Sequence, residues 1–265
     1  MRDDWDDLPG EVRDAVEART GAVGRVEPAP AGNHANIAST VHTPEGPVFV
    51  KAARKEPERD GPEVMSLCWE AAINLHVAEH APRLQWTVEA GGWLVLGFEH
   101  VQARHADYRP GSSDLARLAE VIDALQAMPC PDLLDRRRIE RGTSGMGPLA
   151  GDTLLHCDLN PANLLITDDG TVRVVDWAFV ARGAAFIELA RLIPWLLKAG
   201  HEPARAEGWA ARFPSWTGTD PAHIDLYARA FADRWRANIT TNRAPWALEH
   251  AAAARRWAEH RARRR

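Results

Sequence analysis

Three of the oxygen-bearing side chains in the segment 156–177 have a spacing that suits phosphoryl transfer. Asp158 is followed five residues later by Asn163, and Asp176 follows after a predicted hairpin with an Asp-Gly turn at 169–170. A carboxylate can orient and deprotonate a hydroxyl group, while an amide oxygen and a second carboxylate can hold Mg²⁺ against the phosphates of a nucleotide. Hard oxygen ligands of this kind favour Mg²⁺ over Zn²⁺.

A lysine in an apolar strand is the second chemical signal. Lys51 lies in the predicted strand 48–53, and it is one of only three lysines among 32 basic residues. Where arginine is the default cation, a lysine marks a place that needs a compact ammonium group rather than a planar fork. Taken alone, a strand lysine is more often a solvated edge charge.

The elements that must position these residues form two groups. Alternating and apolar patterns predict a small antiparallel sheet with helices at 9–20 and 62–80, and later a helical region containing one isolated hairpin. A polar stretch rich in turn signals separates them. The sequence therefore predicts an α+β fold with an N-terminal lobe, a linker and a mainly helical C-terminal lobe, over residues 1–98, 99–112 and 113–265.

Bulk composition limits the class of protein. The 265 residues are 45% hydrophobic, which is enough for one large domain or two lobes that share a cleft. We expect a cytoplasmic protein with no membrane partner, because no long apolar run is present and the first residues are acidic. Three scattered cysteines predict neither a disulfide framework nor a structural zinc site.

Charge is unevenly distributed along the chain. The net charge of −5 argues against general binding to nucleic acid. Residues 181–265 nevertheless hold 15 Lys and Arg against 8 Asp and Glu, a balance of +7, whereas the first 180 residues hold 17 against 29, a balance of −12. The two ends of the chain therefore face different electrostatic surroundings.

The run His156-x-Asp158-Leu159-x-x-x-Asn163 resembles the catalytic loop of protein kinases. With its hairpin, and with Asp176 and a tryptophan where kinases have Asp-Phe-Gly, it is more similar to the aminoglycoside phosphotransferase family. The resemblance implies a two-lobed, protein-kinase-like fold. It also implies that Asp158 is the catalytic base, that Asn163 and Asp176 bind magnesium, and that His156 supports the loop.

The resemblance extends upstream of the loop. It implies that Lys51 grips the α- and β-phosphates and is oriented by Glu70, with Glu63 on a similar helix face as the alternative. It also implies that the adenine edge meets the backbone of Glu99 and Val101. The expected cofactors are ATP, with GTP as the alternative nucleotide, and Mg²⁺.

The expected phosphate loop lies between the first two strands and matches the kinase pattern poorly. Gly32 stands where kinases have several glycines, and Asn33 and Asn36 are the nearby side chains able to donate to a phosphate. An ordinary hairpin turn explains this segment equally well.

Three departures from the family leave the acceptor open. Only about 25 residues separate the predicted helix 113–128 from His156, so a usual helical insertion is missing; Glu188 replaces a common aspartate; and the helical part is positive. We expect transfer of a phosphoryl group to a hydroxyl of a small molecule. The open alternatives for the acceptor are an aminoglycoside, a macrolide, an amino alcohol or another metabolite. A nucleotide-binding pseudoenzyme is the alternative to an enzyme. The sequence does not indicate an oligomeric state.

Overall fold

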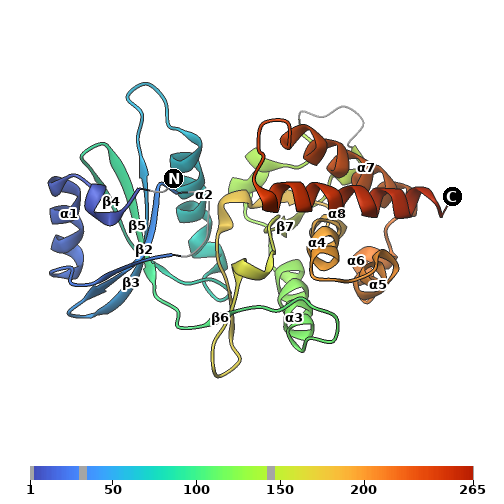
Figure 1. The fold of residues 1–265 in the computed structure, drawn as a ribbon, viewed down its shortest axis with the longest axis horizontal. Coiled ribbons are helices and arrows are strands. Elements are labelled where there is room, and N and C mark those ends of the chain that lie inside the picture. The colour runs from blue at the N-terminus through green and yellow to red at the C-terminus, as the bar shows by residue number, and fades with distance from the viewer. Residues whose placement is uncertain (1–2, 30–34, 142–146, 265) are drawn as a thin grey trace. The chain divides into compact units, whose positions relative to one another are not determined.

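The computed structural model describes residues 3–29, 35–141 and 147–264 (Figure 1). The chain divides into two compact units, and its path passes between them more than once. The first unit contains residues 1–104 and 165–179, and the second contains residues 105–164 and 180–265. The lobe bounds at 98 and 113 stay a prediction from the sequence.

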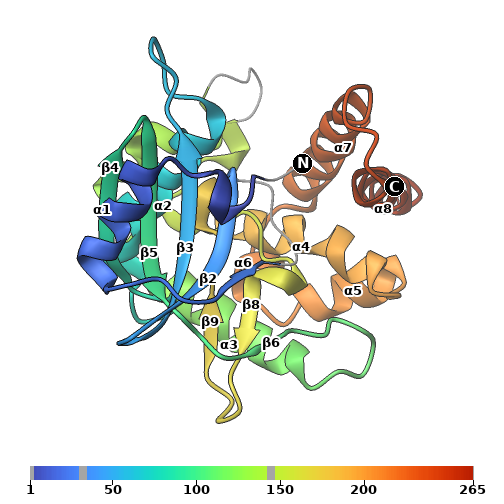
Figure 2. The same cartoon turned by 60° about the vertical axis from the view of Figure 1, so that its left-hand side comes forward.

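The first unit is built on a five-stranded antiparallel sheet in the order β1-β2-β3-β5-β4 (Figure 2). Glycines at 91 and 92 join β4 to β5, and both have positive φ, 53° and 72°. This conformation matches a two-residue hairpin turn and costs glycine little. The strands are β1 (Val26–Pro28), β2 (Ile37–Thr43), β3 (Gly46–Arg54), β4 (Leu84–Ala90) and β5 (Trp93–Glu99).

Two helices of the first unit pack against this sheet with separate cores. The helix α1 (Gly10–Thr20) contributes Val12 and Val16 to a core with Val50 and Val95. The helix α2 (Pro62–Val77) belongs to a second core, which contains Val64, Leu67, Ala53, Leu94 and Leu96. Because side chains alternate along a strand, residues 49, 51 and 53 of β3 point toward α2. The sheet register therefore directs residue 51 to the α2 side.

Gly97 in β5 leaves room for an aromatic ring on the neighbouring strand. A Cβ at this position would lie 2.1 Å from Cε2 of Trp86. We expect Gly97→Ala to lower the free energy of unfolding by about 1–3 kcal/mol, as overpacked cores do. Urea denaturation checks this, with Gly10→Ala as the control, since no atom lies within 4 Å of a Cβ there. Equal stability of the two variants would contradict the prediction.

A hairpin completes the first unit. The strands β8 (Leu164–Ile166) and β9 (Val172–Val174) form it, and β6 (Arg104–His105) lies beside β8 in the strand order. The Val174 amide donates to the carbonyl of His80, 2.6 Å away, just after α2. A short 3-10 turn, Trp177–Phe179, follows β9 and packs on α2. These contacts tie the residues after the hairpin to the same helix that faces β3.

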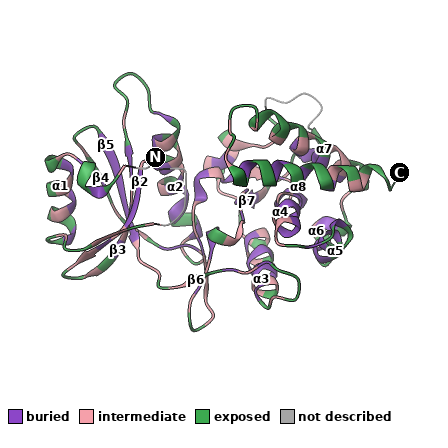
Figure 3. Ribbon diagram, in the orientation of Figure 1, coloured by how far each residue is buried: buried purple, intermediate pink, exposed green. Residues whose placement is uncertain are grey.

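The second unit is mainly helical. An antiparallel pair in this unit joins β7 (Thr153–Leu155) to β10 (Ala181–Gly183), a strand that the sequence patterns did not predict. Figure 3 shows α4 as mostly buried, and this helix continues through Pro194. In the part of the chain that the structure describes, no helix is both long and apolar enough to cross a membrane. The helices are α3 (Asp114–Ala127), α4 (Phe186–Lys198), α5 (Pro203–Ala210), α6 (Pro214–Thr217), α7 (Pro221–Asn238) and α8 (Pro245–Ala262).

Ion pairs hold α8 to its neighbours within this unit. The Arg261 guanidinium donates to Glu207 of α5, at 2.9 Å, and to Asp225 of α7. Glu207 also accepts from Arg264, at 2.8 Å, and from the indole of Trp257, at 2.9 Å. Because Arg261 and Glu207 are largely buried, with 11% and 7% side-chain exposure, this pairing is screened less than a surface pair. Basic residues late in the chain are thus used in packing.

Candidate active site

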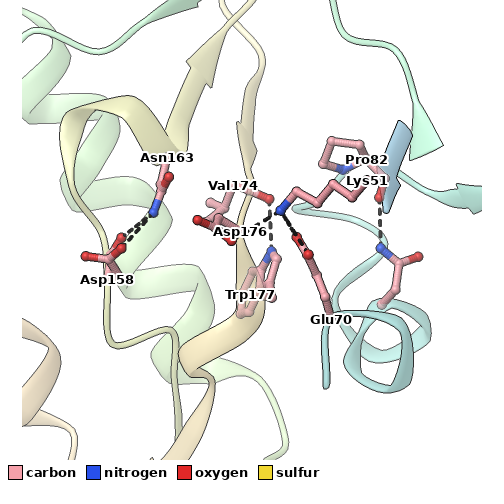
Figure 4. A network of polar contacts seen from close by, with 9 residues as sticks. Lys51, Glu70, Pro82, Asp158, Asn163, Val174, Asp176 and Trp177 are labelled. Atoms are coloured by element: carbon pink, nitrogen blue, oxygen red, sulfur yellow. Dashed lines mark hydrogen bonds and ion pairs between the residues drawn. The ribbon is translucent and has the colours of Figure 1, made fainter. Parts of the chain in front are cut away.

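In the first unit, the Lys51 ammonium lies between two carboxylates. Its Nζ donates to Oε1 and Oε2 of Glu70, at 2.7 and 2.9 Å, and to Oδ1 of Asp176, at 3.2 Å (Figure 4). The three side chains are 12%, 6% and 15% exposed. The ion pair with the α2 helix is made by Glu70, the residue preferred over Glu63 in the sequence analysis.

The electrostatics of this cluster favour a fixed positive charge. Burial alone would lower the pKa of Lys51, but the negative charges of Asp176 and Glu70 outweigh it and raise that pKa. Burial raises the pKa of Glu70, and the charge of Lys51 opposes that rise. Lys51 is therefore protonated across the physiological range and presents a cation with its partners already in place.

Asp176 has an unusual backbone conformation. Its φ is 64°, in the left-handed region that few residues other than glycine adopt, although aspartate tolerates it better than most. The following indole fixes the turn, because Nε1 of Trp177 donates to the carbonyl of Val174 at 2.9 Å (Figure 4). The hairpin and this turn together aim the Asp176 carboxylate at Lys51.

In the second unit, two amide groups orient the Asp158 carboxylate. Nδ2 of Asn163 donates to Oδ2 of Asp158, at 3.1 Å, and to its backbone carbonyl, at 2.9 Å (Figure 4). Nδ2 of Asn160 donates to the same Oδ2 at 3.0 Å. The Asn160 side chain also caps the 3-10 turn Pro161–Asn163 by accepting from the amide of Ala162, at 2.8 Å. Asn163 is therefore placed by a turn that begins at Asn160.

The loop before Asp158 is anchored through its backbone. The buried His156 accepts at Nδ1 from the Asp158 amide, 3.1 Å away, which places the proton of a neutral ring on the other nitrogen. The Glu188 carboxylate of α4 accepts from the amide of His156 at 2.6 Å and from that of Cys157 at 3.1 Å. Glu188 thus braces the loop although it replaces the shorter aspartate.

Cys157 is the second residue with a left-handed backbone, with φ at 68°. For a residue other than glycine this conformation costs roughly 1–2 kcal/mol. Cys157 and Asp176 are the positive-φ residues other than glycine among those that the structure describes. One immediately precedes Asp158 and the other is itself a predicted ligand, and strained backbone of this kind often occurs at functional sites.

The other predicted nucleotide contacts involve Glu99, Val101 and the segment between the first two strands. Glu99 ends β5, and its amide donates to the carbonyl of Arg83 at 2.8 Å, so this N–H already has a partner; Val101 follows and is partly buried. The Asn36 amide oxygen accepts from the Arg54 amide at 3.0 Å, which ties the start of β2 to the end of β3. The predicted phosphate-loop residues Gly32 and Asn33 lie outside the described residues.

The side chains predicted to bind magnesium carry oxygen donors. The Asn163 amide nitrogen faces Asp158, and Figure 4 shows its amide oxygen directed away from that carboxylate. An amide oxygen and a carboxylate are each hard donors of the type that Mg²⁺ prefers, which is the chemistry predicted for Asn163 and Asp176. Among the described residues, no cluster of three or more His, Cys, Asp or Glu side chains forms a separate metal site. Asn163 and Asp176 belong to different compact units.

Sequence reasoning missed three residues that shape the loop. Asn160 bonds to Asp158, the Tyr108 hydroxyl donates to the carbonyl of Leu159 at 3.2 Å, and Nε of Arg191 donates to the carbonyl of Cys157 at 2.6 Å. Asn160 followed by proline is a helix-start signal, which gave a way to find it. The other two bond to the loop backbone from positions 51 and 34 residues away, and no spacing pattern reveals such contacts.

Several solved structures share this fold. Choline kinase LicA from Streptococcus pneumoniae has a TM-score of 0.62 at 12% identity, over 94% of this chain and 98% of that one. Aminoglycoside phosphotransferase APH(4)-Ia has a TM-score of 0.58 at 13% identity, over 92% and 98%. Macrolide 2'-phosphotransferase MphH from Brachybacterium faecium has a TM-score of 0.55 at 15% identity, over 92% and 96%. No curated protein sequence matches the chain.

The sequence profile of the phosphotransferase enzyme family matches residues 56–227, which is more than half of the chain. The match begins after Lys51 and includes Glu70, Asp158, Asn163 and Asp176. The predicted family and fold class are confirmed by this match and by the structural similarity. The chain belongs to the phosphotransferase enzyme family and is a small-molecule kinase with a protein-kinase-like fold.

Proposed function

We propose that this enzyme transfers the γ-phosphate of ATP, in the presence of Mg²⁺, to a hydroxyl group of a small molecule. The observation that carries the proposal is the Lys51 ammonium, held at 2.7 Å from Glu70 and 3.2 Å from Asp176. A preorganised cation beside a carboxylate able to bind a metal is what nucleotide phosphates require. GTP is the alternative nucleotide.

Each side chain has a distinct task in this proposal. Asp158 accepts the proton of the acceptor hydroxyl while the hydroxyl oxygen bonds to the γ-phosphorus, and the bond from that phosphorus to the bridging oxygen of ADP breaks. The two amide donors on Oδ2 hold the Asp158 carboxylate in one orientation for this step. Asn163 and Asp176 would hold Mg²⁺, which when bound neutralises charge on the phosphate oxygens.

Proteins of similar fold support a nucleotide and leave the acceptor open. A structure of LicA contains AMP, one of an APH(4)-Ia mutant contains ADP and hygromycin B, and one of spectinomycin phosphotransferase APH(9)-Ia contains ADP and spectinomycin. These proteins and MphH have acceptors of different chemistry and TM-scores from 0.54 to 0.59 in those forms. Aminoglycosides, macrolides and small amino alcohols are therefore the acceptor classes to compare.

The test is ATP consumption by the purified protein with Mg²⁺ and a panel of those three acceptor classes together with other hydroxyl metabolites. The blank is the Asp158→Asn variant, which keeps the shape of the side chain. Turnover with one class that the blank lacks establishes the reaction and identifies the acceptor class. A protein that binds ATP in a thermal-shift assay but turns over no acceptor, including free hydroxyl metabolites, contradicts the proposal and favours a nucleotide-binding pseudoenzyme.

Replacing the clustered lysine gives a second test. We expect Lys51→Met to lower kcat by about 10²–10³, because a preorganised charge at the phosphates is lost. Glu70 and Asp176 would also lose their shared cation, so the Glu70 carboxyl should take up a proton more readily. Lys55→Met is the matched control, since Lys55 pairs with Glu89 in an exposed position at 2.7 Å. Steady-state kinetics of both variants decide, and equal losses would contradict the role of Lys51.

A further inference from the structure

The guanidinium of Arg191 reaches the catalytic loop from α4. Its Nε donates to the carbonyl oxygen of Cys157 at 2.6 Å, the residue that immediately precedes Asp158. Its NH1 makes a long contact of 3.5 Å with the hydroxyl of Tyr227, and its guanidinium carbon lies 5.6 Å from the ring centre of Phe231. Both aromatic residues belong to α7. All of these groups lie in the second compact unit.

Arg191 and Glu188 hold the loop from the same helix. They are three residues apart on α4, and therefore on the same face of that helix. Glu188 accepts hydrogen bonds from the amides of His156 and Cys157, while Arg191 donates one to the Cys157 carbonyl oxygen. The peptide groups on both sides of Cys157 are thus bonded to charged side chains. A charged partner makes such bonds shorter and stronger than neutral ones.

These hydrogen bonds help to fix the position of the Asp158 backbone. Cys157 is in the left-handed conformation, with φ at 68°, and the chain bends there, just before Asp158. Without the Arg191 bond, the peptide group between Cys157 and Asp158 would keep the bond from its amide to Nδ1 of His156, at 3.1 Å, and would lose the bond to its carbonyl oxygen. Its neighbours on α7, Tyr227 and Phe231, limit the orientations that the guanidinium itself can take.

We propose that Arg191 is a positioning residue for phosphoryl transfer, which fixes the left-handed Cys157 peptide and thereby places the Asp158 carboxylate. The inference rests on the proposed function, because the role of Asp158 does. It adds a link from α7 through one guanidinium to the catalytic loop, so that a change of packing at Tyr227 or Phe231 should alter the rate through the position of Asp158.

The kinetic test compares Arg191→Met with Arg191→Lys and with the control Arg229→Met, an exposed arginine of α7. We expect Arg191→Met to lower kcat by about 10- to 100-fold, the scale on which small misplacements of a reacting group act, with little change in the KM for ATP. Arg191→Lys, which keeps a charged donor, should recover part of the rate. Arg229→Met should match the wild type.

A double-mutant comparison separates positioning from general destabilisation. If Arg191 acts by placing Asp158, then Arg191→Met should change the residual rate of the Asp158→Asn variant by less than about two-fold, because coupled residues are not additive. An equal loss in both backgrounds would overturn the positioning role. So would a loss that appears only as a raised KM for ATP.

A reporter that needs no turnover keeps the two proposals distinguishable. The buried Cys157 thiol can report on opening of the loop once exposed Cys68 and partly buried Cys130 are changed to serine. We expect Arg191→Met to speed the reaction of Cys157 with a thiol reagent in native buffer by about ten-fold or more, with a weaker dependence of the labelling rate on urea than global unfolding would give. An unchanged labelling rate overturns the inference even if the enzyme is active. Faster labelling in a protein that phosphorylates no acceptor shows that Arg191 does hold the loop and that the proposed function has failed.

Discussion

Asp158→Asn is expected to remove nearly all turnover while ATP binding stays nearly intact. The asparagine side chain has the same shape, and its oxygen can still accept from Asn160 and Asn163, which both bond to Oδ2 of Asp158. It cannot take the proton of the acceptor hydroxyl. Loss of general-base catalysis typically lowers a rate by about 10²–10⁴, which should leave a small residual kcat that can be measured in long incubations at high enzyme concentration.

The measurement pairs an ATP-consumption assay with a thermal-shift titration by ATP and Mg²⁺. Asp168→Asn is the matched control, because it removes the same charge at a residue in the exposed turn of the β8–β9 hairpin. The control should retain full turnover, and both variants should show the wild-type shift with ATP. If Asp158→Asn keeps more than about a tenth of the wild-type kcat, Asp158 is not the base.

Glu188→Ala is expected to be the most destabilising substitution considered. The carboxylate is 3% exposed and accepts the amide hydrogens of His156 and Cys157. Removing it leaves two buried N–H groups without an acceptor, and each typically costs about 1–3 kcal/mol. The free energy of unfolding from urea titration should therefore fall by about 2–6 kcal/mol. A loss below about 1 kcal/mol would show that the brace contributes little.

Glu188→Gln should behave differently, and its effect should depend on pH. Burial raises the pKa of the Glu188 carboxyl above its usual value, against the opposing effects of the Cys157 and His156 amides and Arg191. A raised folded pKa means that stability from this group is present below the unfolded pKa and is lost as pH rises through the folded one. The glutamine variant cannot titrate. Its stability relative to wild type should therefore improve from acid toward neutral pH, and an unchanged difference would contradict the sign.

Much of the fold could be predicted from residue patterns, because the apolar positions of elements such as β3 and α2 are also the positions that pack in the core. Alternation along residues 48–53 predicted β3, and it also put Lys51 on the face that meets α2. Helical spacing of apolar residues in 62–80 predicted α2. The short strands β6 and β10 were missed because two or three residues hold too little periodicity to recognise, and partner strands distant in sequence stabilise them.

The site divides in the same way. The spacing of Asp158, Asn163 and Asp176 pointed to one chemistry, and the ion pair between Lys51 and Glu70 was expected from the family resemblance. Residues that bond to the backbone of the loop have no recognisable pattern in the sequence. A carbonyl oxygen is the same at every position, so the side chain that bonds to it can come from any element that the fold brings near.

The left-handed turn at Cys157 has a consequence for which sequences the family can accept. The backbone at this position is fixed by bonds that Glu188 and Arg191 make to its amide and carbonyl groups, whatever its side chain. The residue itself needs only to be small enough for a buried place and able to adopt φ near 68°. Glycine would adopt the turn most easily, whereas valine, isoleucine and threonine would be excluded by their branched Cβ. Variation at this position should therefore follow backbone geometry, and the thiol should be dispensable for the reaction.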